Sequence, residues 1–123
     1  MKNQSFYRNF INNYFDKHYK RDEGKINVSK ADGKIHNLII CAICVNLLEE
    51  TNTTFITQAR LRCGVRPDVL FFRGNQVFIV EVRHTENEKE SGEKLKKLPE
   101  ELREFVIYID CNKDLRTELN KIK

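Results

Sequence analysis

Two short apolar runs on either side of a Gly-Asn pair constrain the fold of this chain more than any other feature. The runs at 66–72 and 77–83 flank Gly74-Asn75, and this arrangement is typical of a β-hairpin with a two-residue turn. A two-residue loop sets the register of the two strands. In that register Asp68 of the first strand faces Glu81 of the second, so each buried strand carries one acidic residue at the same level of the sheet.

Two opposed carboxylates in an apolar sheet call for a cation. Directly paired residues hold their Cβ atoms about 4.5–5.5 Å apart, and two carboxylates at that distance repel each other and are costly to desolvate. A divalent metal ion between Asp68 and Glu81 removes both penalties. Mg²⁺ suits such a site because it keeps several waters and takes only one or two carboxylates. Arg83 lies two residues beyond Glu81, on the same face of the strand, and adds a positive charge beside the expected metal.

Length and composition favour one compact domain that spans residues 1–123. The chain has 123 residues, of which 40% are hydrophobic and 33% charged, enough for a modest core. No apolar run reaches the ~18–20 residues that cross a bilayer, and the N-terminus leads into no signal sequence, so we expect a cytoplasmic protein without a membrane partner. The net charge of +4 is compatible with a polyanionic partner.

Periodicity divides the domain into an N-terminal aromatic helix with its connector, residues 1–33, and a core at 34–123. The pattern predicts helices at 4–20, 34–50, 86–97 and 114–122, and strands at 53–61, 66–72, 77–83 and 105–109. The expected fold class is α/β, a small mixed four-stranded sheet flanked by helices. The aromatic face of the first helix has three interpretations: packing on its own domain, homodimer contact, or contact with nucleic acid. Cys41 and Cys44 lie within the predicted helix 34–50, where buried thiols are favoured over a zinc site.

The segment Pro67-Asp68, followed after a spacer by Glu81-Val82-Arg83, resembles the PD-(D/E)XK or restriction-endonuclease-like nuclease superfamily. The αβββαβ core of that superfamily matches the predicted element order over residues 34–110. The segments 33–36 and 66–69 are most similar to its small resolvase-like and competence-protein-like branches. The resemblance implies a metal-dependent nuclease that hydrolyses DNA phosphodiesters, with Mg²⁺ or Mn²⁺ held by Asp68 and Glu81 and with Arg83 as a catalytic residue.

One departure from the family pattern keeps a second function open. The family usually has lysine where this chain has Arg83, and arginine keeps its proton at any working pH, so it cannot be a general base. Arg83 could orient or stabilise charge only. Alternatively, Lys94, Lys96 or Lys97 reaches back from the following helix. The competing hypothesis is a catalytically inactive nuclease-fold protein that binds nucleic acid or a protein partner.

Chain direction selects the remaining site candidates. The helix 34–50 should run antiparallel to the strand after it, so its start lies at the site and its end lies far away. His36 is therefore a better catalytic candidate than Glu49 or Glu50. Arginines crowd the same edge and predict a nucleic-acid-binding phosphate clamp, because guanidinium forks match phosphate oxygens. Besides Arg83, its members are Arg60, Arg62 and Arg66.

Overall fold

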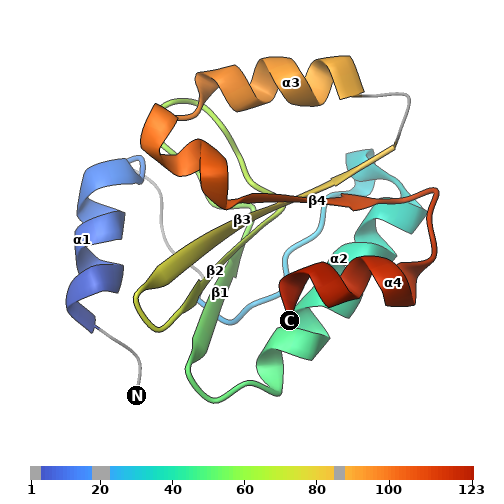
Figure 1. Cartoon of the computed structure of the whole chain (residues 1–123), viewed down its shortest axis with the longest axis horizontal. Coiled ribbons are helices and arrows are strands. Elements are labelled where there is room, and N and C mark those ends of the chain that lie inside the picture. Colours follow the sequence, from blue (N-terminus) through green and yellow to red (C-terminus); the bar gives the residue numbers. More distant parts are fainter. Residues whose placement is uncertain (1–3, 18–22, 85–87) are drawn as a thin grey trace.

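The computed structural model describes residues 4–17, 23–84 and 88–123 and has the predicted α/β architecture (Figure 1). A four-stranded sheet has the order β1-β2-β3-β4, in which β1, β2 and β3 are antiparallel and β4 is parallel to β3. The elements are α1 (Gln4–Tyr14), α2 (Lys34–Leu48), β1 (Thr53–Thr57), β2 (Val69–Arg73), β3 (Gln76–Arg83), α3 (Glu88–Lys97), β4 (Val106–Asp110) and α4 (Leu115–Leu119). Short 3₁₀ turns occupy Lys30–Asp32, Glu100–Phe105 and Asn120–Ile122.

The hairpin forms in the predicted register. Arg73 pairs with Gln76 across the turn, and the ladder continues to Val69 opposite Val80. Gly74 adopts a φ of +61°, which favours glycine at the first central position of a two-residue hairpin loop. The turn therefore fixes which side chains of β2 and β3 face each other.

Helices cover both faces of the sheet, so the domain has three layers (Figure 1). On one face, α1, α3 and the 3₁₀ turn after α3 enclose an aromatic core in which Tyr7 and Phe10 contact Phe72 with ring centroids 4.8 and 5.2 Å apart. On the other face, α2 and α4 cover a second core built on Phe71 and the buried side of α2. The aromatic face of α1 thus packs on the sheet of its own chain.

Several boundaries differ from the prediction. The strand expected at 53–61 ends at Thr57, because Gln58 adopts a φ of +53°, and side chains beyond it no longer alternate as on a strand. Helix α1 ends at Tyr14 rather than at residue 20, and residues 18–20 of the predicted helix lie outside the described part of the chain. Within the described residues, no helix is long and apolar enough to cross a membrane.

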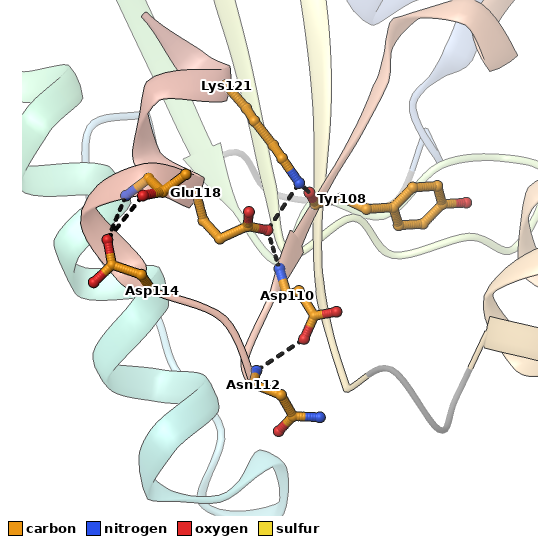
Figure 2. Close-up of polar contacts among 7 residues, drawn as sticks. Tyr108, Asp110, Asn112, Asp114, Glu118 and Lys121 are labelled. Atoms are coloured by element: carbon orange, nitrogen blue, oxygen red, sulfur yellow. Dashed lines mark hydrogen bonds and ion pairs between the residues drawn. The ribbon is translucent and has the colours of Figure 1, made fainter.

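A polar network ties α4 to β4 (Figure 2). Glu118 is 3% exposed, and its side chain accepts a hydrogen bond from the Asp110 backbone N–H at 2.8 Å and pairs with Lys121 at 2.8 Å. Lys121 also donates to the Tyr108 carbonyl at 3.0 Å. Asp114 caps the helix by accepting a hydrogen bond from the Thr117 backbone N–H. The C-terminal helix is thereby held by directional contacts as well as by apolar packing.

The Glu118→Ala variant should lose about 2 kcal/mol of unfolding free energy, since it leaves the buried Asp110 N–H without an acceptor. Glu118→Gln keeps an acceptor for that N–H and should lose clearly less. Urea unfolding of both variants measures the difference. Equal losses would show that the charge pair with Lys121, and not the backbone hydrogen bond, dominates.

Candidate active site

The hairpin brings Asp68 and Glu81 to one end of the sheet. Asp68 immediately precedes β2, and the ladder pairs Val69 with Val80, which leaves Asp68 opposite Glu81. The Asp68 Oδ2 atom accepts a hydrogen bond from the Val82 backbone N–H at 2.8 Å. This bond fixes the carboxylate against β3. The expected meeting of the two acidic side chains is therefore seen in the structure.

Burial makes these carboxylates chemically unusual. The side chains of Asp68 and Glu81 are 18% and 12% exposed. Burial, reinforced by the neighbouring Asp68, raises the pKa of Glu81 to about 8, although Lys94 opposes the shift. Two acidic groups in such a place cannot both ionise cheaply without a compensating cation. The pair is thus prepared to accept positive charge.

Helix α2 contributes His36 from its first turn. The His36 Nε2 atom lies 3.3 Å from Asp68 Oδ2. The hydrogen bond to Asp68 raises the pKa of His36, while burial acts in the opposite direction. Because α2 runs away from this end of the sheet, Glu50 lies elsewhere and pairs with Arg73 at 2.8 Å. The direction argument for His36 placed it correctly beside the acidic pair.

Helix α3 contributes a lysine that the family motif does not identify. The Lys94 Nζ atom donates to Glu81 Oε2 at 2.9 Å and to the Arg66 carbonyl at 3.0 Å. The signal in the sequence is helical spacing, since Leu95 and Leu98 pack toward the sheet and Lys94 lies on the same side of the helix. Of the three lysines weighed as alternatives to Arg83, Lys94 is the one that contacts the carboxylates.

Arg83 shares the face of Glu81 but stacks on an aromatic ring. Its guanidinium carbon lies 3.9 Å from the ring centroid of Tyr108, the residue that pairs with Glu81 in the β3–β4 ladder. Cation–π stacking of this kind holds the guanidinium over one ring face. Arg83 thus belongs to the wall of the site, and the positive group on the acidic pair is Lys94.

The predicted phosphate clamp needs a correction at Arg62. Its guanidinium donates to the backbone carbonyls of Phe15, Asn12 and Asn13 at 2.8, 2.6 and 3.4 Å. Arg62 therefore caps the C-terminal end of α1 and has a structural role. The reason is the early end of β1, which removes the strand geometry that would have aligned it with its neighbours. Arg60 and Arg66 are exposed, and Arg66 adjoins the site through its carbonyl.

The acidic pair opens into a cavity of about 410 Å³ between the end of the sheet, the start of α2 and the inner side of α3. This volume is in the range of small-molecule sites. The polar residues that line it are Asp32, His36, Asp68, Glu81, Arg83, His84, Glu90, Ser91, Lys94 and Tyr108.

The donor set suits a hard cation with few protein ligands. Within residues 4–17, 23–84 and 88–123, no group of three or more His, Cys, Asp or Glu side chains could hold a metal ion. Two carboxylates are nevertheless sufficient for Mg²⁺ or Mn²⁺, which prefer oxygen ligands and fill the remaining positions with water and substrate oxygens. The partly buried pair, with its raised Glu81 pKa, fits such an ion.

Comparison with known proteins found no matching family model, no similar curated protein and no similar solved structure.

The Glu81→Gln variant should be more stable than the wild type in metal-free buffer, and the difference should grow with pH. Glu81 has a pKa of about 8 in the folded protein against 4.5 ordinarily, so folding is penalised as pH rises between these values and fully penalised above the higher one. Thermal unfolding in EDTA across this range measures the gain. A variant less stable than the wild type throughout would show that the Lys94 pair outweighs the burial of the charge.

Proposed function

We propose that this protein is a metal-dependent nuclease of the PD-(D/E)XK type that hydrolyses DNA phosphodiesters. The observation that carries the proposal is the partly buried, opposed pair of Asp68 and Glu81 with the Lys94 ammonium 2.9 Å from Glu81. An acidic pair beside a lysine at the mouth of a cavity provides the groups that phosphodiester hydrolysis requires. The fold supports the same assignment, because α2, the three antiparallel strands, α3 and the parallel β4 follow the αβββαβ order.

Asp68 and Glu81 would hold Mg²⁺ or Mn²⁺. When bound, such an ion neutralises charge on a phosphate oxygen and lowers the pKa of a water molecule. Asp68 is kept in place by the Val82 N–H and by His36, whose Nε2 atom lies 3.3 Å from Asp68 Oδ2. The chain thereby orients one ligand before any ion arrives, which is the usual benefit of contacts around a metal ligand.

Lys94 supplies the mobile positive charge of the site. If Asp68 and Glu81 held a metal ion, the Lys94 Nζ would supply positive charge to the attacking water or to the developing charge on the phosphate. Lysine is better suited than arginine to proton transfer. Arg83, stacked on Tyr108 at the cavity wall, is placed to bind a neighbouring phosphate. In this assignment Lys94 has the role that the motif would otherwise give to position 83.

The charges favour a polyanionic substrate, and we propose DNA as that substrate. Lys94 and Arg83 add positive charge to a cavity that also contains Asp32, Asp68, Glu81 and Glu90, and the chain carries a net charge of +4. Binding of a polyanion to such a surface weakens steeply with salt, because each phosphate contact releases counterions. With the Arg62 guanidinium engaged by α1, the contacts are expected from Arg60, Arg66, Arg83 and Lys94.

The proposal is tested by incubating the purified chain with single-stranded, duplex and branched DNA in Mg²⁺ or Mn²⁺, with EDTA as the control. Cleavage that depends on the metal and stops with EDTA is the expected result. DNA binding without cleavage of any substrate under either metal would favour the inactive nucleic-acid-binding alternative. Absence of both binding and cleavage at low salt would overturn the nucleic-acid assignment.

A further inference from the structure

Helix α2 carries an apolar stripe on the side that faces away from the sheet. Ile35, Leu38, Val45 and Leu48 are 54%, 54%, 51% and 58% exposed, although the opposite side of the same helix is buried in the core. A helix that is apolar on both sides is typical of one that is covered on both sides. Contiguous exposed apolar patches on a soluble domain mark interaction surfaces.

The order of residues along this stripe is symmetric about the midpoint between Cys41 and Ala42. In an antiparallel pair of α2 helices related by a two-fold axis at that midpoint, Leu38 of one copy faces Val45 of the other. Ile35 of one copy lies at the same level along the helices as Leu48 of the other. Cys41 and Ala42, which are half-buried and smaller than the stripe residues, fall at the axis, where the backbones approach most closely. A self-complementary pattern of this kind is what a two-fold homodimer interface requires.

The charges at the two ends of α2 obey the same symmetry. Exposed Lys34 begins the helix and exposed Glu49 follows its end, so the antiparallel pair sets Lys34 of each copy against Glu49 of the other. Within one chain both charges are badly placed, because a helix N-terminus disfavours cations and a C-terminus disfavours anions. Against a second, antiparallel α2 each lies near the favourable dipole end. The charge pattern thus favours a second copy over an unrelated partner.

From these observations we infer that the chain forms a two-fold homodimer through antiparallel pairing of α2. The occupant of the exposed stripe is the α2 helix of a second copy, with Leu38 and Val45 at the centre of the contact and two Lys34–Glu49 pairs at its ends. This interface is separate from the acidic cavity and does not depend on the proposed catalytic activity.

Sedimentation velocity over a concentration series tests the inference, with charge reversals as the decisive variants. Lys34→Glu and Glu49→Lys should each weaken the dimer by roughly tenfold or more, because each converts two attractive contacts into repulsive ones. An equimolar mixture of the two variants should recover a dimer, since one chain then presents two acidic ends and the other two basic ends. Both substitutions suit the dipole of the single helix, so loss of folding does not explain a monomer.

Matched controls and a variant at the centre of the proposed interface complete the experiment. Lys97→Glu and Glu100→Lys change exposed residues at and just after the end of α3, in the layer on the other side of the sheet, and should leave the dimer unchanged. Leu38→Glu should abolish it. A wild-type chain that stays monomeric at every concentration overturns the inference, and so does a dimer that persists in Leu38→Glu. A mixture of the two charge variants that shows no heterodimer overturns the antiparallel pairing.

Discussion

Asp68→Asn is expected to lower the rate of metal-dependent DNA cleavage by about three orders of magnitude or more. The carboxylate is one of only two acidic ligands in the proposed site, and a lost metal contribution of several kcal/mol corresponds to that factor in rate. Asparagine keeps the shape of the side chain and an acceptor for the Val82 N–H. The variant should therefore stay folded, and it should bind DNA as well as the wild type or better, because a negative charge near the phosphate is removed.

Initial rates on the preferred DNA substrate, together with DNA affinity and melting temperature, measure this result. Glu104→Gln serves as the matched control, since Glu104 is exposed and lies outside the cavity. A second readout is thermal stabilisation by Mn²⁺, which the wild type should show and Asp68→Asn should lose. Full cleavage by Asp68→Asn would mean that the acidic pair is not the reaction centre.

Lys94→Met should lower the cleavage rate by about 100-fold or more, a typical effect of removing one positive donor from a transition state. The substitution keeps the length of the side chain and removes the ammonium that lies 2.9 Å from Glu81. The variant should still bind DNA and metal, so the loss should fall on kcat. Lys97→Met, on the same helix but exposed, is the control and should behave as the wild type.

The comparison with Arg83 separates the two candidates for the positive charge. Arg83→Lys should not increase the cleavage rate, because Lys94 already supplies the positive charge beside Glu81. Arg83→Gln should lower the affinity for DNA more than it lowers the cleavage rate of DNA that is already bound. If Arg83→Lys restores cleavage to an otherwise inactive protein, Lys94 has only a structural role and the natural site is silenced. If Lys94→Met keeps the wild-type rate, the assignment of Lys94 fails directly.

The acidic pair could be predicted from the sequence because a two-residue turn determines which residues of the two hairpin strands pair with each other. Once Gly74-Asn75 is recognised, the ladder has one register, and Asp68 and Glu81 meet at its end. His36 followed from chain direction alone. Both inferences depend only on backbone geometry. Helices and strands each have a fixed residue period, so few arrangements of the backbone are possible.

The remaining features depend on side-chain conformation and on how helices sit over the sheet, which local pattern does not specify. Gln58 adopts a left-handed backbone conformation, and no adjacent glycine in the sequence indicates it. Strand β1 therefore ends early, and the Arg62 side chain contacts the end of α1. Arg83 lies on the predicted face of β3, the face of Glu81. Its stacking on Tyr108 could not be predicted, because Tyr108 comes from a strand distant in sequence. The sequence identified Lys94 only as one of three candidate lysines, with Lys96 and Lys97. The packing of α3 on the sheet determines which of the three reaches Glu81.

The network around Glu118 also protects the sheet from uncontrolled growth. As an edge strand, β4 offers outward-pointing backbone groups that another chain could use to extend the sheet, the common origin of aggregation by strand addition. Here the Asp110 N–H is bound by Glu118 and the Tyr108 carbonyl by Lys121. At the opposite edge, the Gly24 N–H bonds to the Phe55 carbonyl of β1. A strand added at either side must first displace these contacts, which disfavours growth of the sheet by strand addition.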